Sequence, residues 1–254
     1  MRAWIATLAL LYGCAGHPPP VAEVDGGVRY GPIDGFTQIP RAGSAGSTSS
    51  NRPTFHELGV TDALIYDVQG RIGLGPNAVF GGYRTLSPSG TATIGQPLES
   101  QGSSIPAGST LDVKDEFDVT QVGYERTLAL GIPVVLAPRI GFAFFRVSNR
   151  IDGPSVEVSR GFSRGNLMVG FRAELPIDPA LSLEMRAFAT PPIPNVPTLY
   201  SIEGRATWHP LGWLGVFVGL GGDRYEFEDT ERPTHNDVRV ILGPLFVGGI
   251  EVQY

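Results

Sequence analysis

The feature that most constrains this chain is a strict alternation of apolar and polar side chains in short runs. In residues 181–188 the odd-numbered positions are apolar, and Ser182, Glu184 and Arg186 alternate with them. Successive side chains of a β-strand point to opposite faces, so each such run predicts a strand with one apolar and one polar face. The same pattern recurs in residues 64–74, 166–175 and 200–208.

The composition agrees with many strands joined by turns. The 254 residues include 34 Gly and 22 Pro, and only 17% are charged. Gly and Pro both disfavour long helices, so an all-β fold is expected. After residue 16 the sequence has no apolar segment long enough for a transmembrane helix. The net charge of −6 and the absence of a basic stripe exclude a surface that tracks nucleic-acid phosphates.

The expected connections alternate between short and long, which is typical of membrane barrels with tight turns at one end and longer loops at the other. The short turns are expected at 74–77, 130–133, 176–179 and 209–212, and the long loops at 41–57, 87–109, 148–160, 190–197 and 228–236. Nine strands are expected at 62–74, 77–87, 114–128, 134–147, 162–175, 180–190, 199–209, 213–227 and 238–254. A tenth strand at 33–40 gives an even number. The alternative is eight strands, with residues 26–75 forming a periplasmic segment or plug. Pro138 and Pro244 fall inside expected strands and predict a bulge or a strand boundary.

The N-terminus is expected to carry an export signal. A positive start is followed by an apolar run at 3–11, which is too short to span a bilayer and ends in Leu11-Tyr12-Gly13-Cys14. This ending resembles the signal of bacterial lipoproteins, which implies cleavage before Cys14 and a lipid on that residue. An ordinary secretory signal cleaved after Gly16 is the alternative. The expected organisation is a signal peptide at 1–13, a linker at 14–30 and a barrel at 31–254.

The C-terminal strand ends on an apolar face formed by Phe246, Ile250, Val252 and Tyr254. It resembles the assembly signal of outer-membrane barrels, an alternating strand that ends in an aromatic residue. Together with the alternating runs, it makes residues 60–254 similar to small bacterial outer-membrane barrels of the outer-membrane protein A type. The resemblance implies a closed, antiparallel, up-and-down transmembrane β-barrel in the bacterial outer membrane. The implied partners are outer-membrane lipids, lipopolysaccharide and the barrel-assembly machinery, with no nucleic acid; the oligomeric state stays open.

Aromatic residues are expected at the two membrane interfaces, where amphipathic rings are favoured. Trp208 and Trp213 flank one short turn, and Tyr124 lies near another. Tyr225 and Phe227 are expected at the opposite end of their strand. Core packing in a soluble β-sandwich is the alternative interpretation of these rings.

Opposite charges two residues apart lie on the polar faces of the expected strands. In a closed barrel these side chains point into the lumen, where cross-strand pairs of opposite sign are favourable and arginine can bind carboxylates bidentately. With eight to ten strands, the interior is only wide enough for side chains. The alternative is a solvated sheet face with surface ion pairs. The predicted lumen charges are Asp67, Arg71, Glu125, Arg139, Arg172, Glu174, Glu184, Arg186, Glu203, Arg205 and Glu251.

The sequence shows no catalytic motif. His235 and Asp237 lie in the last long loop, but their order differs from the Asp-x-His motif of omptin proteases. No His precedes a Ser by two residues, as in lipid A deacylases. We expect no enzyme activity, no cofactor and no metal site, although the acidic last loop could attract divalent cations. The leading hypothesis is an integral outer-membrane barrel with a structural or small-solute role. The alternatives are a lipid-anchored soluble ligand-binding β-protein and a barrel hydrolase acting at the extracellular loops.

Overall fold

A computed structural model describes residues 21–38, 53–100, 103–128, 133–153, 156–229 and 236–254. The expected signal peptide, Cys14 and His235 lie outside these residues. Within the described ranges, no helix is long and apolar enough to cross a membrane.

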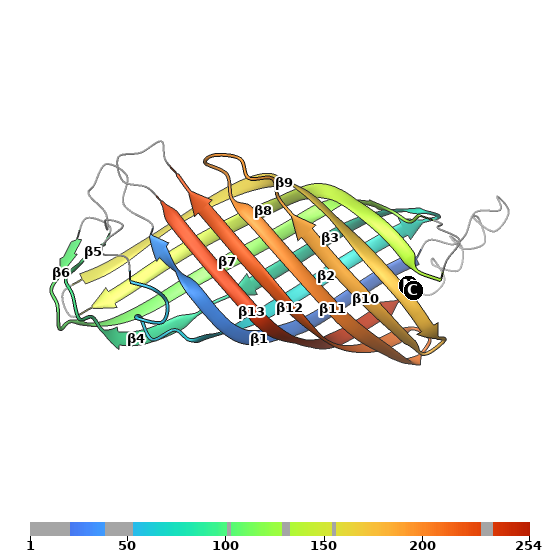
Figure 1. Ribbon diagram of the computed structural model, residues 1–254, viewed down its shortest axis with the longest axis horizontal. Coiled ribbons are helices and arrows are strands. Elements are labelled where there is room, and N and C mark those ends of the chain that lie inside the picture. Colours follow the sequence, from blue (N-terminus) through green and yellow to red (C-terminus); the bar gives the residue numbers. More distant parts are fainter. Residues whose placement is uncertain (1–20, 39–52, 101–102, 129–132, 154–155, 230–235) are drawn as a thin grey trace, which may run out of the picture.

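The described residues form one closed antiparallel barrel of ten strands (Figure 1). Strand β1 pairs with β13, and β3 pairs with β7, so the sheet closes on itself. Strand β4 continues β3 along β7, and β5 and β6 form a separate hairpin. The ten-stranded prediction is therefore confirmed. The strands are β1 (Val21–Gln38), β2 (Asp62–Leu74), β3 (Asn77–Leu86), β4 (Ser89–Thr93), β5 (Leu98–Ser100), β6 (Ser103–Ile105), β7 (Thr110–Arg126), β8 (Val135–Gly153), β9 (Val156–Asp178), β10 (Leu181–Ala189), β11 (Thr198–Leu211), β12 (Leu214–Glu228) and β13 (Asp237–Gln253).

The first strand begins earlier than the sequence suggested. Strand β1 starts at Val21, so residues 21–30 belong to the barrel and not to a linker, and the expected strand at 33–40 covers only the end of β1. Gly26, Gly27 and Gly31 interrupt the alternation and hid this strand. Gly31 is required here, because a Cβ at this position would lie 2.5 Å from the carbonyl oxygen of Pro244.

Pro244 lies in a bulge of β13. Of the two expectations for this residue, a bulge or a strand boundary, the bulge is confirmed. The pairing of β13 shifts by one residue between Leu242 and Phe246 against β1, and between Leu242 and Leu245 against β12. Gly243, with a φ of 134°, adopts a backbone conformation that a side chain would disfavour. The part of β8 that pairs with β7 ends at Arg139. Pro138 lies next to this end, outside the paired part, and it faces outward.

The outer face of the barrel is apolar over a continuous belt. Valine, leucine, isoleucine and phenylalanine side chains from all ten strands are exposed there; examples are Ile72, Val79, Ile140, Val169, Val218 and Phe246. Exposed aromatic rings border the belt on both sides. Tyr30, Tyr83 and Tyr200 lie towards the long loops, and Tyr124, Trp208, Trp213 and Tyr254 lie towards the short turns. We call these two rows the upper and lower girdles. A soluble β-protein would not expose such a surface.

Two of the expected interface aromatics are not on this surface. Tyr225 and Phe227 point inward and are 0% and 3% exposed, so their assignment to a girdle was wrong. Odd-numbered residues of β12 face the interior, and near the loop end of the barrel that interior is apolar. On the last strand, Phe246, Ile250 and Tyr254 are exposed on the outer face and Val252 is partly exposed. Their role as an assembly signal stays a prediction.

Candidate functional site: a filled lumen

The middle of the lumen holds a cluster of buried charges from five strands. Arg29 Nη2 donates to Asp67 Oδ2 at 2.7 Å and also contacts Glu203. Arg84 Nη2 binds the same Asp67 oxygen at 2.8 Å, and its Nη1 binds Asp223 Oδ1 at 2.7 Å. All five residues are buried. Two guanidinium groups therefore bridge three carboxylates and join opposite walls of the barrel.

A second cluster, nearer the short turns, surrounds Glu125, which is 0% exposed. Arg139 Nε donates to its Oε2 at 2.7 Å, and Arg71 Nε donates to its Oε1. Arg172 Nη2 lies 3.4 Å from Oε1. One carboxylate thus holds three arginines, because three strands bring their inward positions to the same level.

A third cluster joins β1, β10, β11 and β13. Arg186 binds Glu184 and lies 2.9 Å from Asp25 Oδ2. Arg205 Nη2 donates to Glu251 Oε2 at 2.6 Å, and its Nε lies 3.2 Å from Glu184 Oε1. Beyond these, Arg172 links this cluster to the previous one through Glu184 at 3.4 Å. The second and third clusters therefore form one connected set of ion pairs, while the described ion pairs of the first cluster stay within it. We call the three clusters together the lumen network.

All eleven predicted lumen charges belong to this network, and the structure adds five more. The full set has seven arginines (Arg29, Arg71, Arg84, Arg139, Arg172, Arg186 and Arg205) and nine carboxylates (Glu23, Asp25, Asp67, Glu125, Glu174, Glu184, Glu203, Asp223 and Glu251). The five additions are Glu23, Asp25, Arg29, Arg84 and Asp223. Three of them lie in the part of β1 that was assigned to the linker, and Asp223 faces inward on β12. Alternation along β12 was the signal that could have found Asp223, whereas the glycines of β1 hid Glu23, Asp25 and Arg29.

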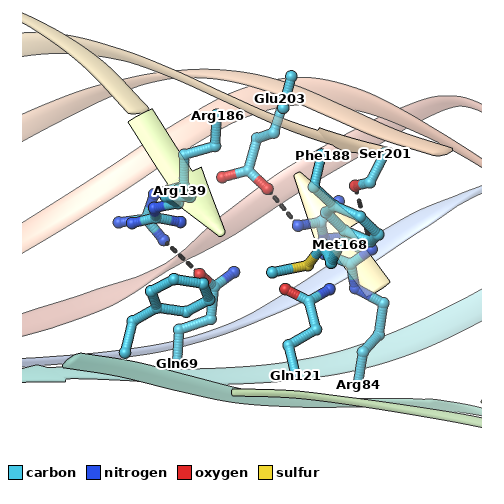
Figure 2. A pocket seen from close by; sticks show the side chains of 12 residues that line it. Gln69, Arg84, Gln121, Arg139, Met168, Arg186, Phe188, Ser201 and Glu203 are labelled. Carbon is cyan, nitrogen blue, oxygen red and sulfur yellow. Dashed lines mark hydrogen bonds and ion pairs between the residues drawn. The ribbon is translucent and has the colours of Figure 1, made fainter. Parts of the chain in front are cut away.

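A small cavity lies among these charges (Figure 2). It has ≈ 20 Å³ of space for the centre of a water molecule, which is room for one or two waters. Figure 2 shows Arg84, Gln121, Met168 and Glu203 in its wall. Sites for small molecules are more than ten times larger, at about 300 Å³ and above. The cavity therefore accommodates water and no organic solute.

Towards the long loops, the same lumen is filled by rings. We call Phe55, Phe117, Phe145, Phe162, Tyr225 and Phe227 the aromatic plug. The ring of Phe117 lies 6.2 Å from that of Phe145, and Phe145 lies 5.6 Å from Tyr225. Phe162 and Phe227 are 4.4 Å apart. Apolar contacts between facing strands thus close this half of the barrel.

Phe55 enters the plug from a loop and not from a strand. It is fully buried, and its ring meets Phe117 edge to face at 6.2 Å. The turn that carries it is fixed by a reciprocal pair: Thr54 N donates to Glu57 Oε2 at 2.8 Å, and Glu57 N donates to Thr54 Oγ1 at 3.2 Å. Gly59 follows with a φ of 75° and packs against the Thr91 backbone, where a Cβ would lie 2.7 Å from the carbonyl oxygen. The turn is therefore wedged between the barrel mouth and β4.

Beyond the upper girdle, on the side of the long loops, β4, β7, β8 and β9 continue as a sheet that we call the platform (Figure 1). This platform has an apolar core of its own, made of Leu58, Ile94, Leu98, Ile105, Leu111, Val113 and Ile151. Its outward positions on β7 and β8 carry charges such as Lys114, Glu116 and Arg150. An apolar core under a charged outer face is the organisation of a soluble protein.

Asp115 is a buried carboxyl in this platform, outside the membrane-spanning part of β7. Its outward neighbours are Lys114 and Glu116, which are exposed. Asn149 Nδ2 donates to Asp115 Oδ1 at 2.7 Å. Burial raises the pKa of the Asp115 carboxyl to about 7, against the lowering effect of that hydrogen bond.

Comparisons with known proteins bear on the fold. No protein-family model and no curated protein matches the sequence. The outer membrane protease OmpT from Escherichia coli superposes with a TM-score of 0.50 at 10% identity, over 94% of this chain and 98% of that one. Ail, the attachment invasion locus protein of Yersinia pestis, gives a TM-score of 0.34 at 10% identity, over 92% and 99% of the two chains. The transport unit of the autotransporter AIDA-I from Escherichia coli gives 0.39 at 10% identity, over 92% and 89%.

The even number of antiparallel strands, the short turns at one end, the apolar belt and the two girdles define a class. They are the features of barrels that span the bacterial outer membrane. The likeness to OmpT shows the same fold. This protein is therefore an integral outer-membrane β-barrel.

Proposed function

We propose that this protein is a closed, non-conducting barrel of the outer membrane with a structural role. In this role it holds the extracellular platform of β4, β7, β8 and β9 at the cell surface. The observation that carries the proposal is that the lumen is filled at two levels by different means. The lumen network occupies the part next to the short turns, and the aromatic plug occupies the part next to the long loops.

The lumen network and the aromatic plug each block a path for solutes, and the physical reason differs between them. Opening the network would separate charges that are buried and paired, and breaking such a pair is strongly destabilising. Opening the plug would expose apolar rings to water. The ≈ 20 Å³ cavity among the network charges supports a structural role over a small-solute role.

The proposal includes the surroundings of the barrel. The belt and the girdles support contact with outer-membrane lipids and lipopolysaccharide. The outward apolar face at Phe246, Ile250, Val252 and Tyr254 supports recognition by the barrel-assembly machinery, as in barrels of the outer-membrane protein A type. A lipid on Cys14 would add a second anchor at the periplasmic end, where β1 begins. The proposed role needs no catalytic residue and no cofactor.

Solute exclusion is tested by swelling of liposomes that contain the full-length protein, with arabinose as the probe. We expect the swelling rate of protein-free liposomes. A porin in parallel liposomes shows that the assay responds. Swelling by the wild-type protein would contradict the closed lumen.

The orientation of the platform is tested in intact cells with a membrane-impermeant maleimide. Glu157→Cys places a thiol on the exposed part of β9, and Trp213→Cys places one at a short turn of the opposite end. We expect labelling of the first and not of the second. The wild-type chain, which has one cysteine, gives the background. Labelling of Trp213→Cys alone would mean that the barrel has the opposite orientation, with its short turns at the cell surface.

A further inference from the structure

The small cavity in the lumen has a cationic wall (Figure 2). Four guanidinium groups line it, and they belong to Arg29, Arg84, Arg139 and Arg186. Of the described carboxylates of the lumen network, only Glu203 belongs to the wall. Four positive groups therefore face one negative group at this place.

The neutral polar groups of the wall add further hydrogen-bond donors. Gln69 Oε1 accepts from Arg186 Nη1 at 3.1 Å, which leaves the amide N–H groups of Gln69 as donors. Ser201 Oγ accepts from Arg84 Nη1 at 3.3 Å, and its own hydroxyl proton can be donated elsewhere. Gln121 contributes a second amide. The wall consequently offers more donors than acceptors.

Arg29 shows the effect of this excess of donors. Its side chain is 2% exposed, so water outside the barrel cannot solvate it. Its Nη2 binds Asp67 and Glu203, but its Nε and Nη1 have no hydrogen-bond acceptor among the residues that the structure describes. Nη1 lies 3.6 Å from Asp223 Oδ2, which is too long for a hydrogen bond. A buried donor without an acceptor is costly, so a ligand that accepts hydrogen bonds would stabilise this region.

The excess carboxylates of the lumen network lie away from the cavity. The network has nine carboxylates and seven arginines, but Glu23, Glu174 and Glu251 lie near the strand ends at the short turns. Nearer the cavity, Arg139 pairs with Glu125, and the same carboxylate also binds two other arginines. The cavity therefore lies on the cationic side of the network.

We propose that this cavity binds a small inorganic anion, chloride. The ion is a single atom slightly larger than a water molecule, so it matches a cavity of ≈ 20 Å³. It would accept charge-assisted hydrogen bonds from the guanidinium groups and further bonds from Gln69, Gln121 and Ser201. A water molecule would bring more donors to a wall that already has them in excess. The site does not depend on the structural role, because a conducting barrel can hold the same ion.

The first test is urea unfolding of the full-length protein in lipid vesicles, with sodium chloride replaced stepwise by sodium gluconate. The ionic strength stays constant, so the screening of surface charges does not change. Above the Kd for chloride, each tenfold rise in its concentration should raise the folding equilibrium constant about tenfold. Gluconate is too large for the cavity. A stability that does not change with chloride concentration would overturn the proposal and assign the cavity to water.

Variants of the wall test the place of the ion, and a heat-dependent gel shift verifies that each is folded. Gln121→Glu puts a carboxylate where the anion would bind, so the response to chloride should disappear. Gln96→Glu is the matched control at an exposed position between β4 and β5, and it should keep the response. Ser201→Ala removes one donor and should need about tenfold more chloride for the same effect. It decides the question if Gln121→Glu does not fold. An unchanged response in either wall variant would overturn the site.

Crystals of the wild-type protein grown with sodium bromide locate the ion directly, because bromide scatters anomalously at its absorption edge. We expect an anomalous peak within hydrogen-bond distance of the guanidinium groups in the cavity. A cavity without this peak would overturn the proposal.

Discussion

The two halves of the lumen are built on the same ten strands and have opposite chemistry. Below the upper girdle, inward positions carry the lumen network and outward positions carry the apolar belt. Above it, inward positions carry the aromatic plug and outward positions carry charges such as Glu116 and Glu226. Along the length of single strands, the distribution of side chains therefore changes from that of a membrane protein to that of a soluble protein.

The surroundings of each level explain the inversion. Lipid next to the belt favours apolar side chains outside, and the polar faces must then satisfy one another inside. Above the girdle the outer face meets water, so burial of apolar surface inside becomes the stabilising term. Strand β7 shows both regimes, with Glu125 buried at one end and Phe117 buried at the other.

The largest effect is expected in the lumen network. Arg29→Met removes one guanidinium from three buried carboxylates: Arg84 still binds Asp67 and Asp223, but Glu203 loses its ion pair and stays buried. We expect the free energy of unfolding to fall by about 3–5 kcal/mol. Urea unfolding in lipid vesicles measures it. Arg150→Met breaks an exposed ion pair of the platform and should leave stability near the wild-type value; equal losses in the two variants would contradict the account.

A smaller effect is expected on the outer face, where one strand crosses the boundary. Val169→Arg places a charge in the belt portion of β9, and we expect it to cost about 2–4 kcal/mol. Ser163→Arg, six residues away on the same face but above the girdle, should be nearly neutral. The same unfolding assay compares the two. A comparable loss in free energy of unfolding at both positions would contradict a boundary at the upper girdle.

The smallest effect is local and depends on pH. The folded-state pKa of Asp115, at about 7, lies above the ordinary value of an aspartate in an unfolded chain. Folding is therefore favoured when this carboxyl is protonated, and that contribution is lost as the pH rises to about 7. Amide exchange in residues 110–117, corrected for its intrinsic pH dependence, should become faster over this interval. Asp115→Asn should remove the pH dependence of the exchange. A pH dependence that persists in this variant would have to come from another group.

Alternation was enough to predict most of the barrel. Ion-pair partners such as Glu184 and Arg186 recur at every second position, and this pattern marks both the strand and its polar face. Alternation gives two faces but does not say which one is inside, so Tyr225 was placed on the wrong side of a correctly located strand. Phe55 could not be found at all, because a loop residue that inserts into the barrel has no periodicity. The glycines of β1 concealed Arg29 for a related reason: they lack the side chains that make alternation visible.

The most direct test of the central claim is ion conductance of the full-length wild-type protein in planar lipid bilayers with concentrated KCl. Ions are the smallest probes of a path, so they are the strictest test of a lumen closed by the network and the plug. We predict a flat current trace after insertion has been verified by a heat-dependent gel shift. Stable conductance steps from the wild-type barrel would contradict the account and would require a continuous aqueous path through the lumen.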